Sequence, residues 1–402
     1  MTAIPRYRSF DGPAVLSAGF RPFFLLAALW AALAVPLWLM IFAGQARLAS
    51  TLPPTVWHVH EMVFGYGAAV VAGFLLTSIP NWTGRMPLQG APLAVLALIW
   101  IMGRLAILVS VWIGAPGTAV LDLAFPVLFL GVVAREIIAG RNWRNLPMLA
   151  ALSALLLGNL LVHLDAIGLT GTAALGNHLG VATLLMLISF VGGRIVPSFT
   201  RNWLTRERPE IAAPASFDAV DRVVLGLIAL TLIVWLFASE TIIAPWVELA
   251  GGIAVAVRLV RWRGQATLRE PLLWVLHLAY GWLAVGFLLL GFNGFIPVMP
   301  ETTALHALTV GAVGTMTLAV MTRASLGHTG RPLVAGWGTT AIYVLVTIAA
   351  VARLFAPLSE DHYLGLLTLA GMGWSGAFGL FVLLYAPPLM RPRVKGEAAR
   401  PI

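Results

Sequence analysis

The sequence predicts an all-α polytopic membrane protein with about twelve transmembrane helices. Of the 402 residues, 60% are hydrophobic and only 10% are charged, and the mean hydropathy is +0.92. A soluble domain carries about 25% charged residues, so this chain has too few charges to cover a surface that faces water. Long apolar runs recur along the whole chain, and arginine is distributed unequally between the segments that connect them. These observations exclude an ordinary soluble globular protein.

Each predicted span is an apolar run of roughly 20 residues, which is the length that a helix needs to cross a bilayer. The runs carry little or no charge, and proline, glycine or arginine bounds each of them. In chain order, the predicted spans are 20–42, 57–79, 91–113, 117–138, 145–168, 174–197, 220–239, 243–260, 271–292, 302–324, 333–355 and 363–386. The first run is long enough to stay in the membrane, so we predict no cleaved signal peptide.

Arginine placement predicts the orientation of the spans in the lipid bilayer. If the N-terminus is cytoplasmic, the connections after even-numbered spans are cytoplasmic too, and only Arg47 and Arg353 fall on the outer side. This asymmetry follows the positive-inside rule and places both termini in the cytoplasm. It also accounts for the net charge of +9, so we predict no nucleic-acid partner. We expect a single integral membrane domain, 1–402, with a disordered cytoplasmic tail at 391–402.

A weak internal repeat recurs every four spans. His60 lies 25 positions before Arg85, and His306 lies 25 positions before Arg331. Both arginines end a Thr-Gly-Arg motif, and a fainter copy without that motif begins at His178. Repeats of this kind are common in polytopic membrane proteins. We predict three four-helix units with pseudo-threefold order.

The Thr-Gly-Arg motifs have a structural interpretation and a functional alternative. Glycine after a helix allows a left-handed cap, and arginine marks the cytoplasmic face. The alternative is that the arginine anchors a haem propionate or a phosphate. We favour the structural role because Arg85 and Arg331 lie across the predicted membrane from the histidines. Arg104 lies near the middle of span 91–113, where it needs a carboxylate, a carbonyl or a bound anionic group as its partner.

Histidine chemistry is the main functional signal, because the chain contains no cysteine. Thiolate ligands and disulfides are therefore excluded, and imidazole suits iron and copper. His-bound haem or copper is the natural metal hypothesis. The histidines predicted to lie near the outer face are His58, His60, His163, His178, His306 and His362.

The spacing of these residues suggests separate sites. On a regular helix His58 and His60 point about 200° apart, so they serve different sites unless the start of the helix is irregular. Glu61 shares a helix face with His58 and is a candidate to orient an imidazole or to carry protons. We assign His60 and His306, which share a repeat position, as candidate haem ligands. The candidate copper ligands are His58, His163 and His178.

Structural alternatives stay open for several of these positions. Glycines follow both repeat histidines and leave room for a flat macrocycle, or let helices pack closely: Gly65, Gly67, Gly311 and Gly314. His328 and His362 are at span ends, where histidine is often an interfacial residue. His163 and His277 are candidates for buried partners in helix contacts.

Two segments resemble the NnrS family of bacterial membrane proteins: His58–Gly65, with the sequence HVHEMVFG, and Arg323–Arg331, with the sequence RASLGHTGR. The resemblance extends over essentially the whole chain, including the early segment Gly19–Phe24. It implies a haem- and copper-containing inner-membrane protein associated with denitrification and with resistance to nitric oxide stress. Nitric oxide or a related small gas would then be its ligand or substrate.

The predicted architecture also resembles the catalytic subunits of haem–copper oxidases and nitric oxide reductases. Those proteins have twelve helices with pseudo-threefold order and place histidine ligands on helices 2, 6 and 10. The present chain lacks their adjacent pair of histidines in helix 7, and its tenth span has one outer histidine where they have two. This difference argues against their binuclear centre, because the resemblance is one of architecture.

The histidines predict a haem- or copper-binding membrane protein, and the resemblance to the NnrS family implies that it binds both and protects bacteria from nitric oxide. A redox enzyme would need an open metal position and an electron donor, which the sequence does not identify. A sensor or a scavenger would bind the gas without turnover. The alternative outside metal chemistry is a transporter for a small solute or metal with structural histidines, which Arg104 and the internal repeats favour.

Overall fold

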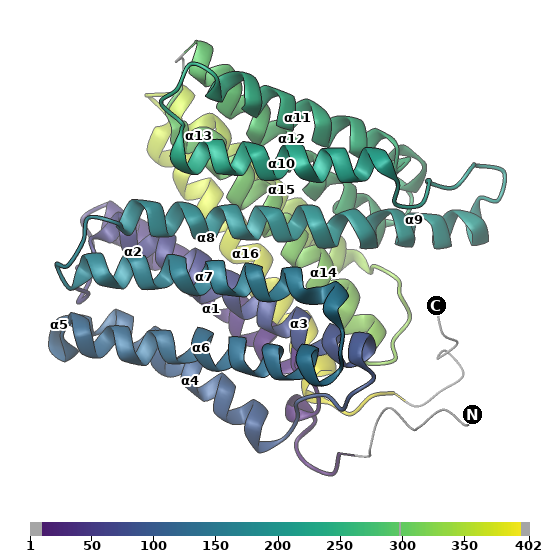
Figure 1. The fold of residues 1–402 in the computed structure, drawn as a ribbon, viewed down its shortest axis with the longest axis horizontal. Helices are drawn as coiled ribbons and strands as arrows, with labels where there is room; N and C mark the ends of the chain where they lie inside the picture. The colour runs from purple at the N-terminus through teal and green to yellow at the C-terminus, as the bar shows by residue number, and fades with distance from the viewer. Residues whose placement is uncertain (1–9, 297–298, 395–402) are drawn as a thin grey trace. The chain divides into compact units, whose positions relative to one another are not determined.

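The computed structural model of the protein describes residues 10–296 and 299–394. Within these ranges every regular element is a helix, as Figure 1 shows. The predicted tail at 391–402 lies outside the described residues from position 395 onward. Its first residues, 391–394, follow the last helix without further helical structure.

Eleven helical segments among the described residues are long and apolar enough to cross a membrane. They are α1 (Phe20–Phe42), α2 to α3 (Pro54–Thr83), α4 (Ala91–Leu108), α6 (Ala115–Ala139), η3 to α7 (Trp143–Ala166), α8 to α9 (Ala173–Glu207), α10 (Ala219–Phe237), α12 (Pro271–Phe295), α13 to α14 (Glu301–His328), α15 to η7 (Trp337–Leu358) and α16 (Tyr363–Met390). The remaining predicted span, 243–260, is α11 (Ala244–Val260), which has 17 residues. The prediction of an all-α polytopic membrane protein is confirmed.

Short helices occupy several connections. They are η1 (Ala14–Leu16), α5 (Ser110–Ile113) and η5 (Gly264–Thr267). The predicted span 91–113 is wrong in one detail, because α4 ends at Leu108 and α5 begins at Ser110. The break falls at Val109, whose ψ of 22° departs from the helical value.

Three of the long helices in the described part of the chain contain a π-helical segment, and they are the three helices of the predicted repeat. The segments are η2 (Glu61–Gly67), η4 (Ile188–Gly192) and η6 (Ala307–Gly314). Two of them begin at the residue directly after a repeat histidine, namely His60 and His306. π-Helical turns are rare and occur frequently at functional sites. They were not predicted from the sequence.

The π-helical segments divide each long helix into two α-helical parts. These parts are α2 (Pro54–His60) with α3 (Ala68–Thr83), α8 (Ala173–Leu187) with α9 (Gly193–Glu207), and α13 (Glu301–His306) with α14 (Thr315–His328).

The predicted left-handed glycines after the first and third helices are confirmed, with φ of 70° at Gly84 and 76° at Gly330. The neighbouring Arg85 donates through Nε to Glu136 Oε2 at 2.5 Å.

The described residues form two compact units, each of which is considered by itself. The first contains residues up to Thr183 together with Ala324–Gly330 and Val382–Val394. The second contains Leu184–Arg323 and Arg331–Phe381. This division does not test the three predicted four-helix units, which stay a prediction.

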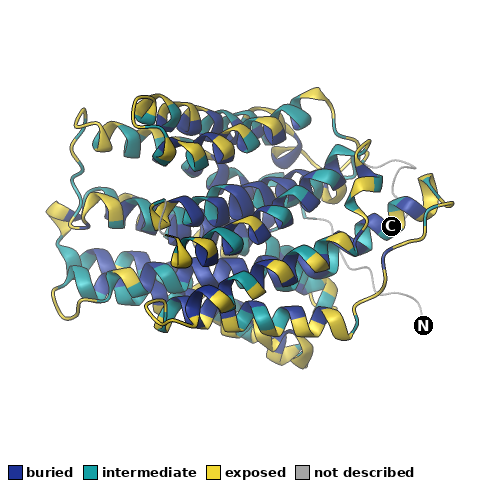
Figure 2. Cartoon of the chain, turned by 90° about the horizontal axis from the view of Figure 1, so that it is seen from above, coloured by how far each residue is buried: buried dark blue, intermediate teal, exposed yellow. Residues whose placement is uncertain are grey.

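Buried and exposed residues occupy different faces along the helices (Figure 2). In the first unit, α4 packs on α6, α6 packs on α7, and η2 contacts α1 and α4. In the second unit, α11 packs on both α10 and α12, and η6 contacts α12 and α15. The packing of α4, α6 and α7 near η2 gives the first unit an interior in which side chains from four spans meet.

Arg21 anchors the end of α16 to α1 inside the first unit. Its side chain is buried, and Nη1 donates to the carbonyl oxygens of Leu389 at 2.8 Å and Arg391 at 2.7 Å. A cation is favourable at the C-terminus of a helix, where carbonyl groups lack helical partners. The charge in the segment Gly19–Phe24 therefore has a structural role.

Candidate metal centre

A cluster of six buried polar residues lies inside the first unit. Their relative exposures do not exceed 3%, and they come from α2, η2, α4, α6 and α7: His60, Glu61, Arg104, Asp122, Asn159 and His163. Ionisable side chains at membrane depth are expensive, and they persist when they pair with one another or serve a function. The contacts within this cluster show how its charges are compensated.

Arg104 lies between the two carboxylates of the cluster. Its Nη1 donates to Glu61 Oε1 at 2.8 Å, and its Nη2 donates to Asp122 Oδ1. The guanidinium also lies over the ring of Trp100, 5.8 Å from the ring centroid. Of the partners expected for this charge, a carboxylate, a carbonyl or a bound anionic group, the structure shows carboxylates. In their ionised forms the three side chains leave one net negative charge.

The second carboxylate oxygen of Asp122, Oδ2, contacts two polar side chains of α7. Asn159 Nδ2 donates to it at 2.8 Å, and His163 Nε2 lies 3.0 Å away. The orientation of the Asn159 amide follows from this contact, because a reversed amide would put its oxygen against the carboxylate. Asn159 Oδ1 is therefore the atom that faces His60, at 2.8 Å from Nε2.

His60 is surrounded by oxygen acceptors. Its Nδ1 lies 3.0 Å from Glu61 Oε1, and its Nε2 lies 3.3 Å from Asp122 Oδ2 in addition to the Asn159 oxygen. A neutral imidazole carries one N–H donor, so one ring nitrogen would direct a lone pair at these acceptors. A metal ion at that nitrogen would accept the lone pair, and it would also reduce the net negative charge of the cluster.

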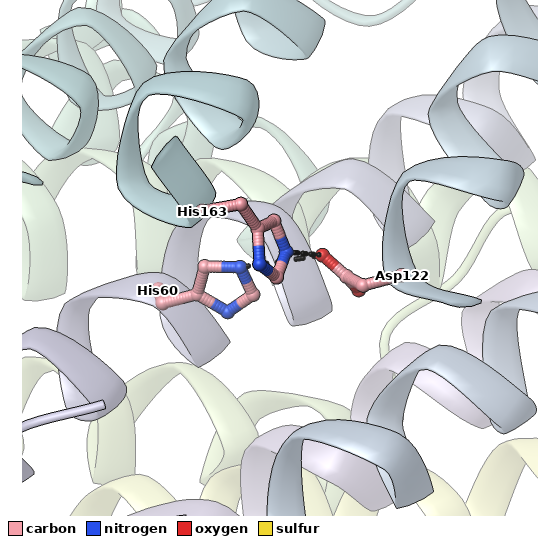
Figure 3. A group of neighbouring side chains, drawn as sticks. All are labelled: His60, Asp122 and His163. Carbon is pink, nitrogen blue, oxygen red and sulfur yellow. Dashed lines mark hydrogen bonds and ion pairs between the residues drawn. The ribbon is translucent and has the colours of Figure 1, made fainter. Parts of the chain in front are cut away.

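The geometry fits a small metal ion. One ligand atom each from His60, Asp122 and His163 can be chosen so that all lie within 4.8 Å of one another, and Figure 3 shows the three side chains converging. Metal–ligand distances of about 2.0–2.2 Å place neighbouring ligand atoms roughly 3–3.5 Å apart. The two distances to Asp122 Oδ2, 3.3 Å from His60 and 3.0 Å from His163, fall in that range.

Glu61 orients His60, although helical spacing had predicted His58 as its partner. A metal-bound histidine almost always donates its other ring N–H to a carboxylate, a carbonyl or water. The Nδ1 contact of His60 with Glu61 provides this interaction. The partner is therefore the residue directly before Glu61, which is the first residue of η2.

Gly65 brings the π-helix close to the cluster. A Cβ at this position would lie 2.8 Å from Arg104 Nη1 and 3.0 Å from Glu61 Oε2. Trp100 Nε1 donates to the Gly65 carbonyl at 3.1 Å. The glycine therefore gives the paired Arg104 and Glu61 side chains the space they occupy. Its predicted role as a slot for a flat macrocycle does not match this packing.

The other predicted site residues lie outside this cluster. His58 stacks on Trp38, with ring centroids 4.8 Å apart and an interplanar angle of 14°. His178 is half-buried on α8 in the same unit but is not one of the three converging residues. His306 belongs to the second unit, where its Nδ1 lies 2.5 Å from the Thr302 carbonyl oxygen. The assignments of His58 and His178 to copper stay predictions.

The glycines after His306 are covered by tryptophans of the second unit. A Cβ at Gly311 would lie 2.7 Å from ring atoms of Trp282, and a Cβ at Gly314 would lie 2.5 Å from Trp374. Close helix packing, the structural alternative, accounts for both positions.

Asp122 and Asn159 are not among the site residues predicted from the sequence. A signal was present for each: Asp122 is an acidic residue in the apolar interior of the span 117–138, whose other acidic residue, Glu136, is near its end, and Asn159 is four residues before His163. Residues four apart share a helix face, so the second signal follows from the spacing alone.

Comparison with known proteins gives one family. The family model described as NnrS protein matches residues 14–393, which is nearly the whole chain. A search of curated proteins finds no match to this chain.

Proposed function

The chain belongs to the NnrS family of membrane proteins, and on that premise we propose that it binds copper in the buried cluster and protects bacteria against nitric oxide. It acts in the inner membrane of denitrifying or nitric-oxide-exposed cells, with both termini in the cytoplasm. Family membership supports a membrane protein related to the nitric oxide response. The metal, the cellular location and the protective role are parts of the proposal.

The observation that carries the copper proposal is the environment of His60. Both of its ring nitrogens face oxygen acceptors, and His163 and Asp122 present further ligand atoms to the same point. Two imidazoles suit copper, zinc and iron, and the absence of cysteine removes thiolate competitors. Among these metals, the family resemblance favours copper.

Each residue of the cluster then has a defined role. His60, Asp122 and His163 hold the ion, Glu61 orients His60, and Arg104 offsets the carboxylate charge. Bound copper supplies one-electron chemistry toward a small gas such as nitric oxide. The buried position of all the ligands keeps bulk water away from the ion.

The two predicted haem ligands, His60 and His306, differ in how well their surroundings fit haem. An iron atom at His60 Nε2 would have to displace both the Asn159 and the Asp122 oxygens, so His60 fits a small ion and does not fit haem. His306 fits better, because the contact of Nδ1 with Thr302 fixes the proton there and makes Nε2 the ligand atom. We therefore keep His306 as the proposed haem ligand, without the glycine slot expected beside it.

The transporter alternative loses one of its supports. In the sequence it was favoured by the internal repeats and by Arg104, a charge near the predicted membrane midplane. In the structure this guanidinium is already paired with Glu61 and Asp122. A site for an anionic solute at Arg104 would require one of these pairs to open.

The test is metal analysis with absorption spectra of the purified protein, oxidised and reduced. We expect stoichiometric copper in the native chain, its loss in His163→Ala and Asp122→Asn, and its retention in His362→Ala, whose histidine is exposed. A haem band that disappears in His306→Ala but persists in His60→Ala supports the haem assignment. Iron or zinc in place of copper would overturn the choice of metal, and a metal-free native protein would overturn the site.

The same preparation separates the functional classes. An enzyme consumes nitric oxide when an electron donor is added, whereas a sensor or a scavenger shows a spectral change at stoichiometric gas without turnover. Uptake of a solute into vesicles by a metal-free protein would favour the transporter alternative.

A further inference from the structure

The second unit contains an arginine-lined cavity of about 410 Å³. It lies between the segment that follows α9 and the connection from α11 to α12, and Figure 1 shows that both are at the same end of these helices. Its lining includes Arg208, Ile211, Arg263, Gln265, Leu268 and Arg269. By the arginine asymmetry of the sequence, this end faces the cytoplasm.

Local hydrogen bonds hold the first wall of the cavity in place. The backbone N–H of Ile211 donates to the carbonyl of Arg208 at 2.9 Å, which closes a turn directly after α9. Arg201 donates through Nε and Nη2 to the Pro214 carbonyl at 3.2 and 3.0 Å. These contacts fix the loop against α9.

The second wall has an unusual backbone conformation at Arg263. This residue has a φ of 56°, in the left-handed region that non-glycine residues rarely adopt. The turn of η5 that follows is held by the Ala266 N–H to the Arg263 carbonyl at 3.0 Å and by Thr267 Oγ1 to the Gly264 carbonyl at 2.8 Å. Strained conformations of this kind persist where the surrounding structure holds them, often at ligand sites.

The charges of the cavity are only partly compensated by the protein. Arg208 donates to Glu210 at 2.5 Å and lowers the pKa of that carboxyl. Nearby Arg261 pairs with Asp218 and lowers its pKa to about 2. Arg263 and Arg269, in contrast, form no ion pair with any residue that the structure describes. Two guanidinium groups therefore line one cavity without a carboxylate partner.

The carboxylate that is closest in sequence is already engaged. Glu270 directly follows Arg269, and its Oε1 accepts the Leu272 N–H at 3.2 Å at the start of α12. It therefore serves the N-terminus of that helix. Like charges in one cavity repel one another, and an anionic ligand removes this repulsion.

We propose that this cavity binds a phosphate ester, supplied by the head group of an anionic phospholipid or by a free phosphate compound in the cytoplasm. The guanidinium group matches phosphate through two parallel hydrogen bonds, which makes arginine the preferred residue for such sites. The cavity adjoins the ends of three spans, where basic residues recognise lipid head groups. The apolar side chains of Ile211 and Leu268 in its lining favour the lipid as the source.

The test titrates the full-length, detergent-purified protein with phosphatidylglycerol, phosphatidylcholine or inorganic phosphate and measures binding by native mass spectrometry. The test variant is Arg263→Gln with Arg269→Gln. The control is Arg222→Gln, an exposed arginine at the start of α10 outside the cavity. We expect the double variant to bind phosphatidylglycerol roughly 10- to 30-fold more weakly, with no change in the control.

The two sources give different results. Tight binding of phosphatidylglycerol over phosphatidylcholine identifies a lipid site, whereas binding of inorganic phosphate without lipid preference identifies a soluble ligand. Equal binding by the double variant and the native protein overturns the proposal, as does an equal loss in the control. The unfolding temperature of each variant is measured in parallel, and a test variant that unfolds is replaced by the single variant Arg269→Gln.

Discussion

The two helices that contain the repeat histidines share their backbone plan. Both begin after a proline, Pro53 in one and Pro300 in the other, each with ψ near 145°. Both become π-helical at the residue after the histidine, and both are followed by a glycine with positive φ, Gly84 or Gly330. The similarity therefore includes backbone features that the sequence repeat alone did not reveal.

The surroundings of the two histidines are different. His60 is fully buried and faces two carboxylates and an amide, whereas His306 is half-buried and contacts a main-chain carbonyl of its own helix. The residue after the histidine is Glu61 in the first helix and Ala307 in the second. One backbone plan therefore places the two histidines in different surroundings, because the neighbouring residues decide the charge around each.

Removing the carboxylate that joins the cluster should have the largest effect. In Asp122→Ala, Arg104 loses one partner, and the polar groups of His163 and Asn159 lose their acceptor. We expect a loss of roughly 3–5 kcal/mol in unfolding free energy, because a broken buried ion pair leaves an uncompensated charge. Thermal unfolding in detergent measures the change. The variant Asp122→Asn preserves the volume of the side chain, so it separates the loss of the charge from the loss of packing. An Asp122→Ala protein as stable as the native protein would refute the coupling of these groups.

Changing Glu61 tests the carboxylate that follows the histidine in the first helix and is absent from the second. Glu61→Gln removes the carboxylate that orients His60 while it keeps the shape of the side chain. Loss of such an interaction typically lowers metal affinity about 10- to 100-fold. Copper titration against a chelator measures this, with His306→Ala as the control that leaves the cluster intact. Unchanged copper affinity in Glu61→Gln would contradict the role of this contact.

Alanine at the matched glycines sharpens the comparison further. Gly65 and Gly311 each lie five positions after the repeat histidine, and each would place a Cβ within 3 Å of a packed side chain. We expect both substitutions to cost about 1–3 kcal/mol through overpacking, but only Gly65→Ala to weaken copper binding as well. Gly131→Ala is the control, because no atom lies within 4 Å of the added Cβ. Equal effects of the two substitutions on copper binding would contradict the proposed difference between the two helices.

The smallest effects are expected at the glycines that follow the two helices. Alanine at Gly84 adopts positive φ at a cost of about 1 kcal/mol and meets no nearby atom. Alanine at Gly330 pays the same backbone cost and also places its Cβ 2.6 Å from the Val394 carbonyl oxygen. Unfolding temperatures should therefore fall slightly for Gly84→Ala and further for Gly330→Ala. The reverse order would show that the Val394 contact is absent in solution.

Composition and periodicity predicted the fold well because the membrane imposes them. Each span must be long and apolar, so the runs of the sequence mark the helices directly. The left-handed glycines were predictable for a similarly local reason, since a Gly-Arg pair after an apolar run indicates a helix end. The π-helical segments were not predictable, because their residues are as apolar as those of ordinary helices.

The candidate metal centre was predicted only in part. His60, His163 and Glu61 were chosen for their chemistry, and the need of Arg104 for a carboxylate, a carbonyl or a bound anionic group followed from its depth in the membrane. Of the residues that join them, Asp122 comes from a further helix, α6, and Asn159 comes from α7, the helix of His163. Sequence alone does not say which helix faces overlap. Pairing His60 with His306 followed repeat symmetry, which takes no account of the different residues around each histidine.

The order of the three charged residues in the chain has a consequence for biogenesis. Glu61, Arg104 and Asp122 lie on three consecutive spans. Each span alone brings an uncompensated charge into the lipid, at a cost of about 2.5–3.5 kcal/mol on insertion scales. The first carboxylate gains its partner only when the next span has been synthesised, and the cluster is complete only after the third. The charges on these three spans therefore compensate one another only when all three helices are present, which couples the stability of each helix in the membrane to the other two.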